Sequence, residues 1–509
     1  MVADNTPVII GVGQYAERPQ DDGYAALSHM DLAGRALAAA IDDTAASGDV
    51  TQAIDTICAI RQFEISYTEA VAPFGKSDNP PRSIGKRVGA NPKRAILEIA
   101  GGQANQKMVG ELASDIAQGS SEVAVIAGSE AISTVRRLVE QGDFPDWSEQ
   151  VGGQLEDRGY GLEWANEPQL TLHGGRRPIE GYALADNARR ARLGLSLDEY
   201  RLKIGELFAP FSKVAASNPF AASPVERTAK ELARVTERNR IISEPYTRMT
   251  VSRDQVNQAA AIILASAGKA RELGVPEEKW VHIHAVTSSA ELLTLERPDF
   301  SRGEATHLSL DMALARSDKQ VDDITYFDFY SCFAVPVFSA TEHLQIAPDD
   351  PRGLTLTGGL PFFGGAGNNY SAHAIAEAVA RLRKDRGAFA LVGANGGVMS
   401  KYATGIYSTS PADWSANDRY LRVPKSTNAV AVSSEPFDAA TVETYTIVVT
   451  SKGPRIIFFG RNDAGERIVG NGDVVHEPTM ALFASGEPFG VRLSIKRNEK
   501  GINIGRVCS

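Results

Sequence analysis

Short apolar runs alternate with amphipathic stretches along this chain, a pattern typical of α/β folds. The runs 6–12, 95–99 and 123–127 predict buried strands, and the last two flank a helix with apolar residues at helical spacing. The order of strand, glycine-rich turn, helix and strand returns at 354–394. This repetition predicts two duplicated α/β halves, whose glycine-rich turns lie at the same edge of the sheet.

The second copy of this motif joins a strand, a loop and a helix in one continuous stretch. Residues 354–357 predict a short buried strand, and five glycines follow within 358–367, ahead of an amphipathic helix. Asn368 or Asn369 is expected to cap that helix. The backbone N–H groups of such a turn attract negative charge, so the loop predicts a ligand site.

A polar segment rich in Arg and Glu separates the two halves, from about residue 136 to residue 248. Ser196–Glu199 and Ser223–Glu226 both have the capping-box pattern of a helix start. The segment therefore predicts a helical insertion that covers the ligand site. After it, the apolar spacing of 251–267 predicts one more helix.

The end of the chain changes to short apolar stretches separated by turn residues. They indicate a small all-β domain similar to an OB barrel, with strands expected at 445–450, 455–460, 466–470 and 491–496. The chain is thus divided into an N-terminal half (1–135), a helical insertion (136–248), a C-terminal half (249–415) and a β domain (425–509).

Composition argues against several classes of function. The net charge of −10 opposes nucleic-acid binding, because neutralising phosphates needs a basic face. Without a signal peptide or an apolar run long enough to span a membrane, a cytoplasmic protein is expected. Cys58, Cys332 and Cys508 provide neither a disulfide framework nor a metal site. His282 and His284 share a strand face, but no third ligand at zinc spacing accompanies them.

Several motifs together resemble the thiolase superfamily. They are PVIIGVGQ at the start, the strand–helix–strand unit at 95–128, VSRDQVNQAAAIILASAGKARELG at 251–274, YSCFAVPVFSATEHL at 330–344, GGLPFFGGAGNNYSAHAIAEAV at 358–379 and GANGGVMSKYATGIYST at 393–409. The chain is similar to the sterol-carrier-protein thiolases, and more so to bacterial type 1 thiolase-like proteins that carry the name acetyl-CoA acetyltransferase. Its C-terminal β domain resembles the extra domain of the type 1 proteins.

The resemblance implies a five-layered α-β-α-β-α fold built from the two duplicated halves, with the insertion as a loop domain. It implies a role in lipid metabolism, with an acyl-CoA thioester as substrate and no cofactor beyond the coenzyme A of that substrate. A homodimer is the usual family state. The extra β domain leaves a monomer, or a complex with another subunit, open.

The family's catalytic residues do not carry over to this chain. The family's nucleophilic cysteine falls at Gly102, the histidine of its GHP motif at Gly365, and the second cysteine, of its CxG motif, near Gly393. Its HDCF or NEAF box becomes YSCF at 330–333. Thiolysis needs an activated thiolate and a base, so true thiolysis is not expected.

The candidate site residues follow from the loops and from the resemblance. Strands expected at 324–330 and 388–394 end beside the glycine-rich loop, where open α/β sheets bind ligands. Polar groups expected near the reaction are Tyr330, Cys332, Asn368, His373 and Asn395. Residues expected to hold the acyl-CoA are Gly102, Gln103, Gly364, Gly365, Gly396, Arg176, Arg177 and Arg189, with the arginines at its phosphates. The alternatives are that Tyr330, Cys332 and His373 are core residues and that the arginines form a solvated helix face.

Three functions stay open. A retro-aldol lyase acting on CoA thioesters needs only a base and a donor for the thioester enolate, and Tyr330 resembles the tyrosine of thiolase-fold aldolases that act on steroid side-chain CoA thioesters. A free tyrosine has a pKa of about 10, so such a base needs a lowered pKa. The alternatives are a catalytically silent protein that binds CoA esters or pairs with an active subunit, and a CoA-thioester hydrolase that activates a water molecule.

Overall fold

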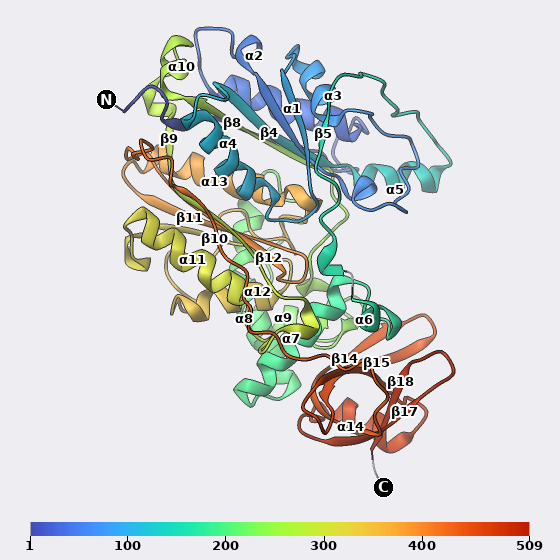
Figure 1. Ribbon diagram of the computed structural model, residues 1–509. Coiled ribbons are helices and arrows are strands. Elements are labelled where there is room, and N and C mark those ends of the chain that lie inside the picture. Colours follow the sequence, from blue (N-terminus) through green and yellow to red (C-terminus); the bar gives the residue numbers. More distant parts are fainter. Residues whose placement is uncertain (1, 166, 508–509) are drawn as a thin grey trace.

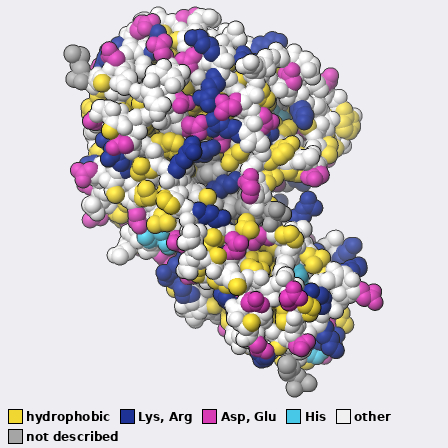
Figure 2. Space-filling model, viewed as in Figure 1, with side chains coloured by type: hydrophobic (Ala, Val, Ile, Leu, Met, Phe, Trp, Pro, Cys, Tyr) yellow, Lys and Arg dark blue, Asp and Glu magenta, His cyan; other side chains and the backbone are white. Residues whose placement is uncertain are grey.

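The computed structural model describes residues 2–165 and 167–507, so Cys508 lies outside the described residues. A large α/β body carries a small β-barrel at the C-terminal end, and the helices of the insertion lie between them (Figure 1). Acidic and basic side chains are interspersed over the face shown in Figure 2. In the described part of the chain, no helix is long and apolar enough to cross a membrane.

The large sheet repeats one pairing pattern twice. Its eight main strands are β1 (Pro7–Ala16), β2 (Thr56–Ile60), β4 (Val123–Glu130), β8 (Gln258–Ser266), β9 (Val281–Ala290), β10 (Tyr326–Phe329), β11 (Phe389–Gly396) and β12 (Lys401–Ser408). In the first half β2 runs parallel to β4, β4 antiparallel to β8, and β8 antiparallel to β1. In the second half β10, β11, β12 and β9 repeat this series of one parallel and two antiparallel pairs. The halves join where β1 pairs with β9.

Helices α4 (Ala104–Ala117) and α13 (Tyr370–Lys384) form the middle layer of the body. Both are largely buried and both contact strands of the two halves. Helix α1 (His29–Asp43) covers the first half from outside, and α11 (Glu304–Ser317) covers the second. The body therefore has five layers, helix–sheet–helix–sheet–helix, and the duplicated fold expected from the sequence is confirmed.

The stretch 251–267 does not form the helix expected from its apolar spacing. Residues 258–266 form β8, and α10 (Ala267–Glu272) begins only after this strand. The helices α1 and α13 both contact β8. The residues between Gln258 and Ser266, AAAIILA, are therefore all apolar and lack the alternation of a half-exposed strand. Periodicity alone does not separate such a strand from a buried helix. β8 also pairs with strands of the first half, although it follows the insertion.

The strand expected at 354–357 is also absent. The Asp328 carboxylate accepts hydrogen bonds from the backbone N–H groups of Leu356 and Thr357, at 2.8 and 3.2 Å. A side chain thus takes the backbone donors that a neighbouring strand would otherwise use, and the segment lies along β10 without extending the sheet.

The insertion is mostly helical, as expected, with three very short strands. Its elements are β5 (Glu156–Asp157), α6 (Pro168–Leu172), α7 (Pro178–Leu193), α8 (Leu197–Ser217), α9 (Ala229–Ala233), β6 (Ile241–Ser243) and β7 (Tyr246–Thr247). Ser196 and Glu199 form the expected capping box of α8. Ser223–Glu226 does not start a helix, because the Ser223 N–H donates to the Phe362 carbonyl; the next capping box belongs to Thr228 and Glu231 of α9.

The C-terminal strands close into a five-stranded barrel. They are β14 (Ala439–Thr450), β15 (Gly453–Arg461), β16 (Arg467–Gly472), β17 (Arg492–Arg497) and β18 (Asn503–Val507), with α14 (Glu477–Ser485) between β16 and β17. Around the ring the order is β14, β15, β16, β18, β17 and back to β14. A five-stranded closed barrel agrees with the OB-like domain expected from the sequence. The other described α-helices and strands are α2 (Val50–Ala53), α3 (Pro80–Val88), β3 (Arg94–Glu98), α5 (Ile132–Gln141), α12 (Ala334–His343) and β13 (Tyr420–Arg422).

Candidate functional site

Gly102 and Tyr330 meet at the centre of the body, where α4 begins and β10 ends. A Cβ atom at position 102 would lie well inside contact distance of the Tyr330 hydroxyl and 2.5 Å from the carbonyl oxygen of Asn395. The Ser371 hydroxyl donates to the Gly102 carbonyl at 2.6 Å and fixes this backbone against α13. The space that a side chain at position 102 needs is therefore filled by the Tyr330 ring.

Tyr330 is buried, with 6% of its surface exposed. Its ring packs edge-on against Tyr370 at a centroid distance of 5.3 Å, and within the described residues its hydroxyl has no hydrogen-bond partner. Burial raises the pKa of the phenol well above its ordinary value, and the neighbouring Cys332 adds to this effect. Tyr330 is thus a neutral hydroxyl at physiological pH, suited to donate a proton or hydrogen bond rather than to act as a base.

Cys332 lies beside Asn395 and Tyr182. The Asn395 amide donates to the Tyr182 hydroxyl at 2.8 Å and approaches the Cys332 sulfur at 3.7 Å. Burial raises the pKa of the Cys332 thiol to about 12. Hydrogen bonds with Tyr182 and Asn395 lower the pKa by a smaller amount. A thiol in this state is not a nucleophile at neutral pH. Tyr182 belongs to α7, so the insertion contributes directly to this cluster.

The glycine-rich loop is packed against its surroundings. A Cβ atom at Gly365 would lie inside contact distance of the Ser252 hydroxyl, and the Gly365 N–H donates to the Arg253 carbonyl at 2.8 Å. Gly364 has a φ of +122° and faces Gln258. The space beside Gly365 is accordingly closed by residues 252–253.

Asn368 and His373 serve as packing groups. The Asn368 side chain accepts from the Gly101 N–H at 2.8 Å and donates to the Arg61 carbonyl at 2.6 Å, so it ties two loops to the start of α13. The expected side-chain cap of α13 is absent: Asn369 stands at the N-cap without such a bond and donates to Gly128 O instead. His373 is fully buried, its Nδ1 bonds to a glutamine oxygen at 2.7 Å, and burial lowers its pKa to about 3.

Gln103 and Gly396 lie against each other next to Gly101. A Cβ atom at Gly396 would overlap the Gln103 side-chain oxygen, which is buried and has no hydrogen-bond partner in the part of the chain that the structure describes. A buried acceptor without a donor is costly, so this amide oxygen is suited to receive a donor from a ligand.

Arg176 and Arg177 line a cavity between the insertion and the C-terminal half, with free space of about 350 Å³ when the part that opens to solvent is included. Its opposite wall includes Thr294 and Val398, and Val398 lies in the turn that follows Asn395. Both arginines are exposed, and Arg177 forms an ion pair with the buried Glu180 at 2.6 Å. The cavity thus combines two basic side chains with a wall that continues toward the Tyr330 cluster.

Arg297 beneath this wall is a residue that the sequence reasoning missed. It is 2% exposed, and its guanidinium donates to the Val398 carbonyl at 2.8 Å and to the Leu292 carbonyl at 3.0 Å. Its Nη2 has no hydrogen-bond partner among the described residues. Burial lowers the pKa of Arg297, and the nearby negative charges of Glu291 and Glu167 act in the opposite direction. No periodicity or motif around residue 297 marks this position.

Arg189 does not join the cavity. It is 5% exposed, pairs with Glu342, bonds to the Tyr200 hydroxyl at 3.1 Å, and stacks over the Phe338 ring at 3.7 Å. The guanidinium is therefore engaged within the core between α7 and α12. The position of Arg189 gives no support to the expected contact with a phosphate of the ligand.

Neither a protein-family model nor a curated protein matches the chain. Among solved structures, a monomeric SCP2-thiolase-like protein type 1 from Mycobacterium smegmatis is 40% identical, with 100% of both chains covered and a TM-score of 0.83. The chain belongs to the SCP2-thiolase-like proteins of the thiolase superfamily. No group of three or more His, Cys, Asp or Glu side chains within the described ranges is arranged to hold a metal ion.

More distant structures share the fold of this SCP2-thiolase-like protein. An acetyl-CoA acetyltransferase from Syntrophomonas wolfei is 15% identical, with 80% of this chain and 100% of that chain covered and a TM-score of 0.55. An Ltp2-ChsH2(DUF35) aldolase is 19% identical, with 79% and 98% covered and a TM-score of 0.57. These likenesses show the thiolase fold of the body.

Proposed function

We propose that this SCP2-thiolase-like protein binds acyl-CoA thioesters and does not perform thiolysis. The observation that carries the proposal is the contact between Tyr330 and Gly102, which fills the space of the nucleophile that thiolysis needs. The Cys332 thiol stays protonated because its pKa is about 12, and His373 bonds to Gln14 in the core. A protein with this centre has neither a thiolate nor a histidine base for acyl transfer.

The acyl-CoA enters through the cavity between the insertion and the C-terminal half. Arg176 and Arg177 at its mouth bind the phosphates, since a protein with a net charge of −10 needs a local basic group for a polyanion. The buried Arg297, with its free Nη2, adds positive potential behind Val398. The acyl end then points along the 396–400 turn toward Asn395.

Calorimetry with CoA, acetyl-CoA and longer acyl-CoA esters tests this function on the intact protein. We expect saturable binding, which Arg176→Ala and Arg177→Ala each weaken by about tenfold through loss of a charge-assisted contact. Arg238→Ala, at an exposed arginine of the same insertion, is the matched control and leaves the affinity unchanged. Mass spectrometry of the same mixtures detects turnover, and CoA-dependent cleavage of 3-ketoacyl-CoA would contradict the proposal.

The position of the Tyr330 hydroxyl favours a second candidate function, the retro-aldol cleavage of 3-hydroxyacyl-CoA esters. The hydroxyl lies where the family has its reacting thiol, and the raised pKa keeps it protonated. In this reaction a base would take the proton of the substrate's 3-hydroxyl group, and the Cα–Cβ bond would break. Tyr330 would donate a hydrogen bond to the thioester oxygen of the enolate, and the proton would return to Cα. Cleavage without free CoA that Tyr330→Phe abolishes would establish this lyase.

We further propose that the protein binds its ligand as a monomer. The insertion and the C-terminal half provide the whole cavity, so one chain carries the complete site. The barrel packs on the insertion through β6, which pairs with β14. A partner subunit is then needed only if a second protein supplies the missing catalytic groups.

A further inference from the structure

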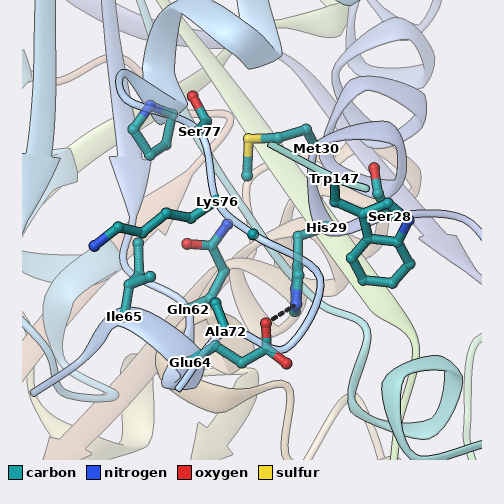
Figure 3. Close-up of a pocket in the computed structure, with 12 residues that line it drawn as sticks. Ser28, His29, Met30, Gln62, Glu64, Ile65, Ala72, Lys76, Ser77 and Trp147 are labelled. Carbon is teal, nitrogen blue, oxygen red and sulfur yellow. Dashed lines mark hydrogen bonds and ion pairs between the residues drawn. The ribbon is translucent and has the colours of Figure 1, made fainter. Parts of the chain in front are cut away.

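A second cavity lies in the N-terminal half, between the start of α1, the loop that follows β2, and Trp147 (Figure 3). The free space between its walls is about 400 Å³ when the part that opens to solvent is included. Met30, Ile65 and the Trp147 indole give it apolar walls. None of the residues discussed for acyl-CoA binding lines it.

Gln62 brings an unpartnered acceptor to this cavity. The residue is 6% exposed, and its side-chain oxygen is buried without a hydrogen-bond partner in the described structure. Figure 3 shows Gln62, His29 and Glu64 around the same space. Because an unsatisfied buried acceptor is unfavourable, a ligand that donates an N–H there is stabilised.

Glu64 brings a negative charge that no cation in the cavity neutralises. The His29 Nδ1 accepts from the Ala131 N–H at 3.2 Å, and the Nε2 then donates to Glu64 at 3.0 Å. Because the Nδ1 is occupied as an acceptor, the ring offers Glu64 a single N–H donor. The other charged residue of the lining is Lys76, and Figure 3 shows its ammonium pointing away from Glu64.

Two hydrogen bonds from residues outside the cavity lining hold the loop that carries Gln62 and Glu64. The Phe63 N–H donates to the buried Glu130 at 2.9 Å, and Asn368 donates to the Arg61 carbonyl at 2.6 Å. Gln62 and Glu64 flank the first of these bonds. A ligand therefore meets acceptors that are already in place, which reduces the entropy lost on binding.

We propose that this cavity is a binding site for a small organic cation, an amidinium or a primary ammonium group on an apolar body. Glu64 and the Gln62 oxygen accept its N–H groups. Trp147 and Met30 cover the apolar part, and the indole adds a cation–π contact. The site does not depend on the acyl-CoA function, because it shares no lining residue with the other cavity.

Calorimetry on the full chain with benzamidine and phenethylamine tests the proposal, with benzamide as the neutral analogue of benzamidine. We expect both cations to bind and benzamide to bind at least tenfold more weakly. Glu64→Gln keeps the shape and removes the charge, and we expect it to weaken benzamidine binding by about ten- to hundredfold. Glu69→Gln makes the same change at an exposed position of the same loop and leaves binding unchanged.

Gln62→Met keeps the side-chain volume and removes the unpartnered acceptor oxygen. We expect it to weaken benzamidine binding several-fold without changing the charge of the cavity. This variant decides the question if Glu64→Gln does not fold, as judged by circular dichroism. The proposal is overturned by equal affinities for benzamidine and benzamide, by the absence of saturable binding of either cation, or by equal effects of Glu64→Gln and Glu69→Gln.

Discussion

The hydroxyl of Tyr330 lies against Gly102, in the space where a side chain at position 102 would begin. The two residues are far apart in the chain and meet because β10 ends where α4 begins. Only glycine fits at position 102, because the Tyr330 ring fills the space that a larger side chain there would need. The glycine at position 102 and the tyrosine at position 330 thus depend on each other.

Gly102→Ala is expected to destabilise the protein by about 1–3 kcal/mol, because a methyl group there overlaps the Tyr330 ring. In a Tyr330→Ala background the same change is expected to be smaller by at least about 1 kcal/mol, which a double-mutant cycle in urea measures. The Asn395 carbonyl, 2.5 Å from the new Cβ, keeps part of the penalty. Gly23→Ala, with no atom within 4 Å, is the control. Equal penalties in both backgrounds would show that Tyr330 does not fill this space.

Much of the fold could be predicted from the sequence, because apolar periodicity and glycine-rich turns are local signals. The repeated strand, turn and helix at 95–128 and 354–394 predicted the duplication. Residues 354–357 nevertheless do not form a strand, because the Asp328 side chain takes the N–H groups of Leu356 and Thr357. The strand β8 was missed because burial on both faces removes the alternation of its residues. Local patterns describe a segment and do not show what covers it.

The candidate site was less predictable, since its state depends on contacts between distant segments. The sequence placed Tyr330, Cys332 and Asn395 near one another, and the structure does the same. It did not show that the Tyr330 ring fills the place of a side chain at Gly102, or that Arg189 is engaged with Glu342. Tertiary packing decides whether a polar residue faces a ligand or the core. The spacing of residues along the sequence does not predict this packing.

His373 is expected to make the stability depend on pH below about 6.5, its ordinary unfolded value. Burial lowers its folded pKa to about 3, so between these values the unfolded chain binds a proton that the folded protein does not. The free energy of unfolding therefore falls as the pH falls, by up to about 1.4 kcal/mol per pH unit from this group. His282 and His284, with pKa values lowered to about 4, add in the same direction.

Urea unfolding of the wild type and of His373→Gln between pH 7 and pH 4.5 checks this expectation. The variant should show a smaller loss of stability over that window, because glutamine has no proton to bind. Its glutamine side chain also retains a donor for Gln14, so the comparison removes the titration more than the contact. A pH slope identical to that of the wild type would contradict the role given to His373.

Cys332 is expected to resist alkylation in the folded protein. Its pKa of about 12 and its burial leave very little thiolate at neutral pH. Treatment with iodoacetamide at pH 7.5, followed by peptide mass spectrometry, should label Cys332 at least about a hundredfold more slowly than in urea. Cys58 is a matched internal control, because it is also buried and burial raises its pKa well above the ordinary value. Fast labelling of Cys332 alone would show a reactive thiol and would contradict this expectation.

Among the described residues, one edge of the large sheet ends in β5, which is only two residues long, and the other edge lies against residues 354–357, so a monomer is expected. At one edge β5 pairs with β3, and the Arg94 guanidinium donates to Glu156 of β5 at 2.8 Å. At the other edge, the Asp328 carboxylate of β10 accepts hydrogen bonds from the backbone of 354–357. A long unpaired edge invites pairing with a second chain, whereas a very short edge strand or a covered edge does not. Light scattering should give the chain mass of 54.5 kDa. Glu156→Ala should promote self-association by loosening β5, whereas Glu140→Ala, at an exposed position of α5, should not. A wild-type dimer at micromolar concentration would show that another surface drives assembly.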